Sequence, residues 1–269
     1  MSDKMSDPAP TQTAALAAPR VQLDDLAALR VWFRSVPGLV IAEAEQALAR
    51  EILPNLFGYH AVQIGTPHAS ELLEHSRISH RLVIGTELIE SRFGRVIADP
   101  VALPIERNSV DVVVLPHTLE FSPNAHGILR EAERILIGEG HVVILGFNPW
   151  SSFGCSRHVL GWRGRAPWSG SFLSLARLKD WLGLLGFEIE RVARASFRPP
   201  ISQPSWHARL EFLERMGAHF WPLLGNVYAL VARKRVEAIM PIRARWARRR
   251  RLAARGVIEP TARTISKRD

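Results

Sequence analysis

The sequence is poor in cysteine and contains no long hydrophobic run. Cys155 is the only thiol among 269 residues, which excludes an internal disulfide and a thiolate zinc cluster and fits a reducing cytoplasm. No stretch approaches the roughly 18 uninterrupted apolar residues of a membrane-spanning helix. Residues 1–19 also lack the basic start and long apolar segment of a signal peptide. We therefore expect a cytoplasmic protein with no transmembrane segment and no metal site.

Charge is distributed unevenly along the chain. The formal net charge of +9 suggests a nucleic acid or an anionic membrane as partner. Residues 233–269, however, contain 13 Lys and Arg against 3 Asp and Glu, whereas the rest of the chain contains 22 basic and 23 acidic residues. We predict a basic tail over residues 236–269, which either contacts nucleic acid or an anionic membrane surface or stays solvated.

The remaining sequence predicts one folded domain over residues 30–235, after a disordered leader over residues 1–29. The start of that leader is rich in Ala, Pro, Ser and Thr and has no repeating apolar face. β-Branched runs predict strands, and apolar residues at helical spacing predict helices. The predicted strands cover residues 60–65, 81–85, 95–99, 110–115, 141–147, 188–196 and 226–234. The predicted helices run from Ile41 to Pro54, from an N-cap at Ser122 to Gly138, from Ser174 to Gly186, and over residues 205–219. Their alternation predicts an α/β fold with a mainly parallel seven-stranded sheet and helices on both faces.

Open sheets of this kind bind ligands at the carboxyl ends of their strands. The segments 98–105, 108–115, 117–121 and 129–140 resemble the second half of a class I S-adenosylmethionine-dependent methyltransferase. The resembling group is methyltransferase type 11, which includes the ubiquinone and menaquinone methyltransferases. The resemblance is close over residues 61–147 and topological elsewhere. It implies a Rossmann-like fold, S-adenosylmethionine as cofactor, and transfer of its methyl group to an acceptor, which we expect to be a small molecule.

The resemblance also implies roles for individual residues. Asp99 matches the acid that binds the adenine amino group, and Pro100 and Val101 match the loop that holds the adenine ring. Gln63 and Gly65 match the start of the glycine loop. Thr86 and Glu87 stand where the family has the acid that binds the ribose hydroxyls. Leu115 and His117 match the strand end beside the methionine part of the cofactor, and Asp111 matches an acid that stabilises the fold.

Two departures from the family pattern keep other interpretations open. The family's Gly-x-Gly-x-Gly is reduced to Gly65-Thr66-Pro67-His68-Ala69, and the ribose acid has no unambiguous match. Asp99 could instead be a turn acid, Gly65 a tight turn without a ligand, and Glu87 an ordinary exposed acid. A non-catalytic binding protein that has lost the donor site is therefore an alternative to an enzyme.

The catalytic residues are not evident from the sequence. His117 is the one candidate for a substrate-side base, because an ordinary imidazole pKa near 6.5 suits proton removal at neutral pH. Residues 148–172 contain Trp150, Trp162 and Trp168 and are interpreted as a substrate lid, or as a packed surface loop. Asn148-Pro149-Trp150 is similar to the motif of amino-directed nucleic-acid methyltransferases but follows the fifth strand instead of the fourth. A nucleic-acid-directed enzyme that uses the basic tail is the other alternative.

Overall fold

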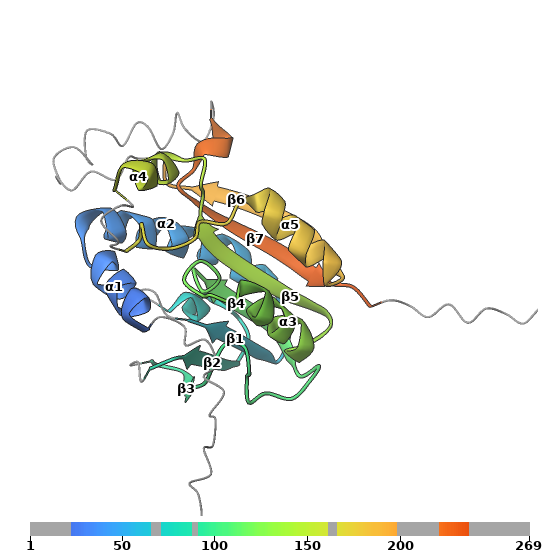
Figure 1. Ribbon diagram of the computed structural model, residues 1–269. Helices are drawn as coiled ribbons and strands as arrows, with labels where there is room; N and C mark the ends of the chain where they lie inside the picture. The colour runs from blue at the N-terminus through green and yellow to red at the C-terminus, as the bar shows by residue number, and fades with distance from the viewer. Residues whose placement is uncertain (1–22, 66–70, 88–90, 161–165, 198–220, 237–269) are drawn as a thin grey trace, which may run out of the picture. The chain divides into compact units, whose positions relative to one another are not determined.

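The described chain forms one seven-stranded sheet. The computed structural model describes residues 23–65, 71–87, 91–160, 166–197 and 221–236. The strand order is β3-β2-β1-β4-β5-β7-β6, and β7 runs antiparallel to both of its neighbours (Figure 1). The strands are β1 (His60–Ile64), β2 (His80–Gly85), β3 (Gly94–Ile97), β4 (Val110–Pro116), β5 (Leu136–Phe147), β6 (Phe187–Ala195) and β7 (Val227–Lys234). The predicted α/β class with a mainly parallel sheet is confirmed.

Helices cover both faces of this sheet. One face carries the two N-terminal helices and the helix directly after β5, and the other carries the helix after β4 and the helix before β6 (Figure 1). The α-helices are α1 (Leu23–Phe33), α2 (Val36–Ile52), α3 (Ala125–Ile135), α4 (Ser152–Leu160) and α5 (Leu175–Leu184), and the short 3-10 helices are η1 (Leu53–Asn55), η2 (Leu72–His75) and η4 (Pro222–Leu224). Among the described residues, no helix is long and apolar enough to cross a membrane.

Strand β4 shows why these strands are almost wholly apolar. Val112 and Val114 pack toward α2, whereas Val113 and Leu115 pack toward α3. Side chains of a strand alternate between the two faces, so a strand covered on both sides needs apolar residues at every position. Two separate cores result, one on each face of the sheet.

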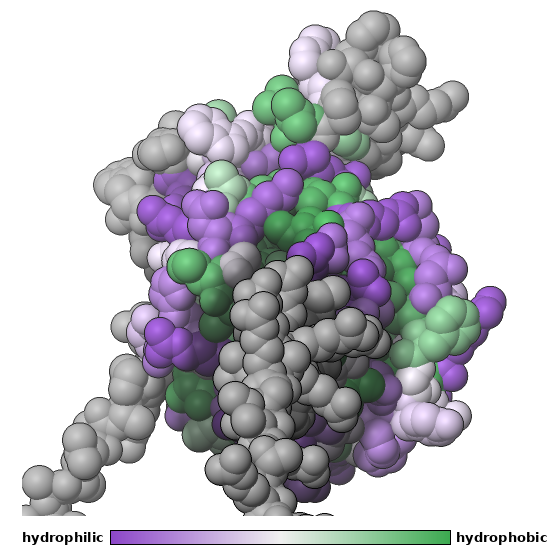
Figure 2. Space-filling model, turned by 90° about the vertical axis from the view of Figure 1, so that its right-hand side faces the viewer, coloured by the Kyte–Doolittle hydropathy of each residue, from purple (hydrophilic) through white to green (hydrophobic). Residues whose placement is uncertain are grey.

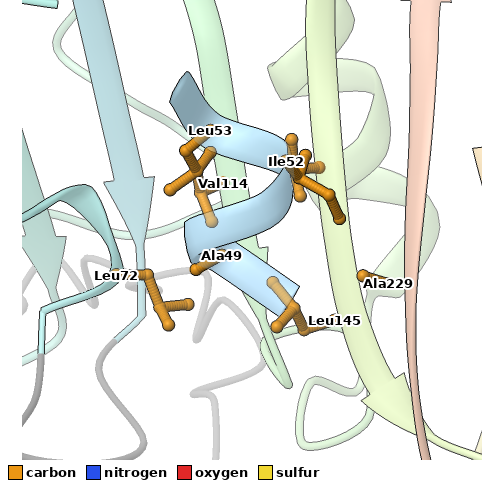
Figure 3. A pocket seen from close by; sticks show the side chains of 8 residues that line it. Ala49, Ile52, Leu53, Leu72, Val114, Leu145 and Ala229 are labelled. Carbon is orange, nitrogen blue, oxygen red and sulfur yellow. The ribbon is translucent and has the colours of Figure 1, made fainter. Parts of the chain in front are cut away.

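The core under α2 contains a small cavity. Figure 3 shows the C-terminal end of α2 above the strands, with the side chains that line the cavity. They are aliphatic without exception: Ala49, Ile52, Leu53, Leu72, Val114, Val143, Leu145 and Ala229. A cavity with no polar atom to hold water or a charged ligand belongs to the packing and not to a site for a nucleoside cofactor.

Helix α3 differs from the prediction at both ends. Its N-cap is Asn124, whose Oδ1 accepts a hydrogen bond from the Gly127 amide at 2.9 Å, while Ser122 caps only the turn before it. The helix ends at Ile135, because Leu136 already pairs with Val110 as part of β5. The stop predicted at Gly138 is therefore wrong, since tertiary pairing ends this helix three residues before its glycine.

The folded region begins earlier than predicted. Helix α1 starts at Leu23, inside the predicted leader, and Leu29 is completely buried. Residues 1–22, the predicted helix at 205–219 and the tail from residue 237 lie outside the described residues. The prediction for the N-terminal boundary thus needs correction, and those for the other two segments stay predictions.

The two ends of the parallel strands differ in character. Figure 1 shows the parallel strands pointing toward the side where α1 lies. The opposite side faces the viewer in Figure 2, where hydrophilic residues are interspersed with separate hydrophobic patches. At that amino-terminal edge Asp111 accepts hydrogen bonds from the amides of Tyr59 and His60, at 2.9 and 2.8 Å, and so ties β4 to the start of β1. This contact fits the structural role predicted for Asp111.

Candidate functional site at the carboxyl edge of the sheet

The carboxyl ends of β3, β2, β1 and β4 lie next to one another. The Gly65 amide donates a hydrogen bond to the carbonyl of Ile84 at 2.8 Å, and the Ala98 amide donates to the carbonyl of Gly85 at 3.1 Å. Thr118 Oγ1 donates to the carbonyl of Ile64 at 2.5 Å. The chain winds outward in opposite directions from β1 and β4, so this edge is the switch point at which such sheets bind ligands. Most of the residues predicted to hold the cofactor are thus brought together.

Only glycine fits at position 65 without strain. Its φ is +89°, and a Cβ at this position would lie 2.6 Å from Thr118 Oγ1. Any side chain would therefore be strained in its backbone and would collide with its neighbour. The remainder of the predicted glycine loop, residues 66–69, lies outside the described residues. Gly65 thus accounts for a tight turn at the switch point, and its contact with a cofactor stays a prediction.

Two polar atoms beside this turn lack hydrogen-bond partners among the described residues. Gln63 is 2% exposed, and its Nε2 donates to the carbonyl of Gly65 at 3.0 Å, but its Oε1 has no partner. Thr86 Oγ1 is likewise buried without a partner. Buried polar groups are hydrogen-bonded in most native proteins, and each exception needs an explanation, such as a bound ligand, water or ion. Both atoms lie where the resemblance implies the cofactor, so the donor set fits a polar nucleoside ligand.

Glu87 is paired with a residue from the N-terminal helix. Nη1 of Arg30 lies 3.0 Å from Oε2 of Glu87, and both side chains are partly exposed, at 24% and 38%. Arg30 lies in α1 and Glu87 follows β2 by two residues. The carboxylate predicted to bind ribose is therefore held by a cation that sequence reasoning did not identify.

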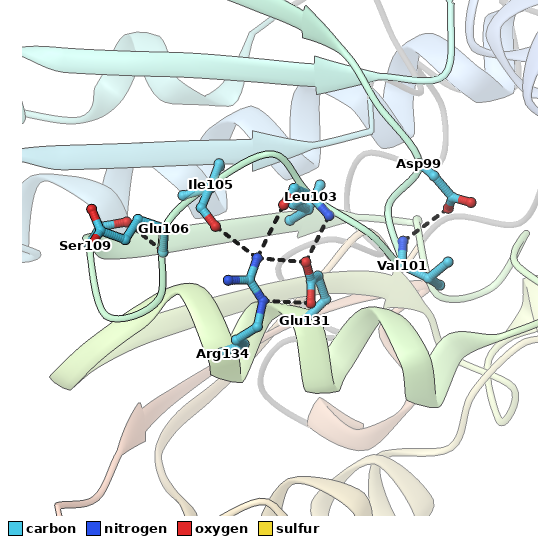
Figure 4. Close-up of polar contacts among 8 residues, drawn as sticks. All are labelled: Asp99, Val101, Leu103, Ile105, Glu106, Ser109, Glu131 and Arg134. Carbon is cyan, nitrogen blue, oxygen red and sulfur yellow. Dashed lines mark hydrogen bonds and ion pairs between the residues drawn. The ribbon is translucent and has the colours of Figure 1, made fainter.

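Asp99 closes a turn and keeps an exposed carboxylate. Its Oδ1 accepts a hydrogen bond from the Val101 amide at 3.0 Å, as Figure 4 shows. This contact is the turn that the alternative interpretation predicts. The side chain is nevertheless exposed, and Pro100 beside it is buried. The turn and the adenine contact are compatible, because one carboxylate oxygen suffices for the turn.

A clamp from α3 holds the loop that follows Asp99. Arg134 Nη2 donates to the carbonyls of Leu103 and Ile105, at 3.1 and 2.8 Å, and Glu131 Oε1 accepts from the Leu103 amide at 2.7 Å (Figure 4). Arg134 also pairs with Glu131 at 2.7 Å. The hydrogen bond with Arg134 holds the pKa of Glu131 below its usual value. The clamp thus fixes the shape of the predicted adenine loop.

His117 is buried between two carboxylates. The residue is 1% exposed, its φ is +52°, and its Nδ1 lies 2.7 Å from Glu120 Oε2. Its Nε2 lies 2.5 Å from Glu45 Oε1. Burial by itself would lower the pKa of His117, but the two carboxylates outweigh burial and raise this pKa to about 10. A protonated ring with both nitrogens engaged cannot accept a proton, so the prediction of a general base does not fit this arrangement.

The surroundings of Glu120 complete this buried network. Its Oε1 accepts a hydrogen bond from the Phe147 amide at 2.7 Å. Burial raises the pKa of Glu120, while the His117 ring opposes that rise. Burial, with a contribution from the charge of Glu120, also raises the pKa of Tyr228, whose hydroxyl donates to the Leu173 carbonyl at 3.1 Å.

Leu115, predicted to line the methionine part of the cofactor, has its side chain fully buried in the core against α3. Only its backbone is therefore available to the edge.

The segment predicted as a lid packs against the end of β5. The Phe147 ring lies 5.9 Å from Trp32, 5.9 Å from Phe153 and 5.0 Å from Phe172, measured between ring centroids. Trp168 lies 5.3 Å from Phe153. Aromatic rings from α1, α4 and the segment after residue 165 therefore form one cluster over this strand end. Residues 161–165 lie outside the described residues, and the lid function stays a prediction.

Asn148 in the Asn-Pro-Trp sequence is used to join two segments of the chain. It is 4% exposed, and its Nδ2 donates to the carbonyls of Leu223 and Gly225, at 2.8 and 2.9 Å. Its backbone amide donates to the carbonyl of Asn226 at 2.8 Å. A side-chain amide engaged in this way supports the backbone before β7 and is not directed toward a substrate.

Strand order and site together define the Rossmann-like methyltransferase fold, and comparison with known proteins agrees. A family model described as a methyltransferase domain matches residues 72–144. A protein of Escherichia coli K12 described as "Uncharacterized protein YafS" is 36% identical over 193 residues, which cover 71% of this chain and 75% of that protein.

Solved structures show the same fold. A methyltransferase from Thermotoga maritima has a TM-score of 0.55 at 16% identity and covers 77% of this chain and 93% of its own. One from Archaeoglobus fulgidus has a TM-score of 0.52 at 19% identity and covers 76% and 96%. The chain belongs to the class I S-adenosylmethionine-dependent methyltransferases.

Proposed function

We propose that this protein binds S-adenosylmethionine at the carboxyl edge of β3, β2, β1 and β4 and transfers its methyl group to a small-molecule acceptor. The observation that carries the proposal is the row formed at this edge by Asp99, Glu87, Thr86 and Gly65. Unpartnered buried atoms of Gln63 and Thr86 beside the same row support it.

The chain's own residues bind and orient in this proposal. Asp99 receives the adenine amino group, Pro100 and Val101 pack against the ring, and Glu87 receives ribose hydroxyls. The bound cofactor supplies the electrophilic methyl group. Methyl transfer needs alignment and exclusion of water more than a strong base, so an engaged His117 is no obstacle. Its role is to hold the end of β4 in position.

The charge of the folded region favours a small molecule over nucleic acid as the acceptor. The body of the protein before residue 233 is nearly neutral, with 22 basic and 23 acidic residues. Nucleic-acid sites in proteins are instead strongly basic and salt-sensitive. The single-thiol composition supports a cytoplasmic location as part of the same proposal.

Calorimetric titration with S-adenosylhomocysteine tests the proposal directly. We expect saturable binding to the wild-type chain and a loss of about tenfold or more in affinity for Asp99→Ala, because a hydrogen bond to a charged group is removed. Glu106→Ala, an exposed acid in the same loop, is the matched control and should bind normally. Absence of binding to the wild-type protein would instead favour the non-catalytic alternative.

The nucleic-acid alternative rests on the basic tail and has its own test. A truncated chain that ends at Val236 removes most of the excess positive charge. The alternative requires a steep, salt-dependent loss of RNA or DNA binding in this truncated chain. Our proposal requires unchanged binding of S-adenosylhomocysteine and, once an acceptor is identified, unchanged turnover.

A further inference from the structure

Helix α1 lies across the carboxyl edge that forms the candidate site. Its Arg30 reaches Glu87 after β2, at 3.0 Å. Its Phe33 ring lies 5.7 Å from the His117 ring after β4. Trp32, which precedes Phe33 in the helix, lies 5.9 Å from Phe147 at the end of β5, measured between ring centroids. One helix therefore contacts the ends of three strands, β2, β4 and β5, and β4 borders the switch point (Figure 1).

This helix is docked by burial on one side and exposed on the other. Leu29 is fully buried and Phe33 is 2% exposed, whereas Val31 is 68% exposed. Ser35 joins α1 to α2, because its Oγ donates to the Trp32 carbonyl at 2.6 Å and caps the N-terminus of α2. Displacing α1 would expose these apolar side chains to water, at a cost of roughly 1.5–3 kcal/mol for each fully buried large side chain.

We propose that α1 covers the cofactor site and that Arg30 is a positioning residue, which holds the Glu87 carboxylate toward the ribose hydroxyls. The inference rests on the proposed function, since it takes Glu87 as the ribose ligand. It adds one thing that the family resemblance does not assign: a cation of the N-terminal helix, Arg30, orients the acid of the donor site.

The contact between Arg30 and Glu87 favours cooperation with the cofactor over competition. Arg30 contacts Oε2 of Glu87, and among the described residues no contact to Oε1 is found. A carboxylate accepts several hydrogen bonds, so Oε1 can receive a neutral ribose hydroxyl while Oε2 keeps its cation. Fixing the carboxylate in advance reduces the conformational cost of binding. Closure of α1 would also keep water from the reacting atoms.

The test compares Arg30→Gln with Arg34→Gln in the full chain, by calorimetry with S-adenosylhomocysteine. Arg34 is an exposed arginine directly after α1, and the structure gives it no ion pair among the described residues, so it controls for the change in charge. We expect Arg30→Gln to raise the Kd about tenfold and Arg34→Gln to leave it unchanged. In a double-mutant cycle, Arg30→Gln should cause no further loss of affinity when Glu87→Gln is already present, because the partner of Arg30 is then absent.

Amide hydrogen exchange of the wild-type chain gives a second measurement that does not depend on any variant. We expect S-adenosylhomocysteine to slow exchange in residues 23–33, because the ligand and the helix stabilise each other. An unchanged or lower Kd for Arg30→Gln, or unchanged or faster exchange in α1, would overturn the inference. If Asp99→Ala still loses binding in that case, the proposed function stands and only the role of α1 is refuted. If the wild-type chain binds no S-adenosylhomocysteine, the proposed function itself fails.

Discussion

Nε2 of His117 lies 2.5 Å from Oε1 of Glu45, a residue 72 positions earlier in the chain. Both side chains are completely buried, and the other ring nitrogen of His117 binds Glu120 at 2.7 Å. One imidazole ring therefore joins helix α2 to the end of β4, at the edge where the cofactor is proposed to bind. Such a network stabilises the fold only while each of its members is present.

Glu45→Ala should destabilise the protein strongly. Removing one partner leaves a protonated ring buried beside a gap, and breaking a buried ion pair costs about 3–5 kcal/mol. Urea unfolding followed by circular dichroism measures the change. Glu43→Ala, an exposed acid on the same helix, should change the free energy of unfolding by no more than about 0.5 kcal/mol. A cost below about 1 kcal/mol for Glu45→Ala would contradict a charged network.

Stability should fall as pH rises through the neutral and alkaline range. The pKa of His117 is raised from 6.5 to about 10 by the two carboxylates, so the folded protein holds a proton that the unfolded chain releases. The stabilisation is fully present below pH 6.5 and is lost as pH approaches 10, with a slope of up to about 1.4 kcal/mol per pH unit. Urea midpoints at several pH values, compared with those of His117→Gln, isolate this contribution. Parallel curves for the two proteins would refute it.

Gly65→Ala should be unfavourable for local reasons. The residue has a φ of +89°, and the added Cβ would lie 2.6 Å from Thr118 Oγ1. Strain of this kind costs on the order of 1–3 kcal/mol. The matched control is Gly183→Ala in α5, where a Cβ meets nothing within 4 Å and the expected effect is a stabilisation of about 0.5–1 kcal/mol. Thermal unfolding distinguishes the two variants. Equal effects would show that the Thr118 side chain moves aside at little cost and would contradict the prediction.

Arg134→Leu should loosen the loop over residues 101–105. The guanidinium donates to the Leu103 and Ile105 carbonyls, so its loss leaves two acceptors and Glu131 without their partner. Arg134 is 27% exposed, which limits the expected loss of stability to about 1–2 kcal/mol. Amide exchange of the loop should accelerate and the affinity for S-adenosylhomocysteine should fall. Arg130→Leu, an exposed arginine on α3, should leave both measurements unchanged.

Much of the fold was determined by patterns close together in the sequence. Apolar runs predicted all seven strands, because a sheet covered on both faces selects such runs directly. The Ser174 cap and the stop at Gly186 define α5, since capping is a local effect. The family resemblance likewise indicated Asp99 and Gly65, which lie at the carboxyl edge of the sheet, and their contact with a cofactor stays a prediction. The predicted end of α3 at Gly138 was wrong, because long-range pairing of Leu136 ends that helix at Ile135.

The partners of the site residues were decided only by the tertiary structure. Arg30 meets Glu87 across 57 positions, and Glu45 meets His117 across 72, so no local pattern could predict either pair. The sequence therefore determined a sheet, a family and the order of candidate residues along one edge. Tertiary packing decided which charges face one another, which raises the pKa of His117 and brings the N-terminal helix against the candidate edge. The physical reason is that pKa and contact depend on distances between segments, which composition and periodicity do not contain.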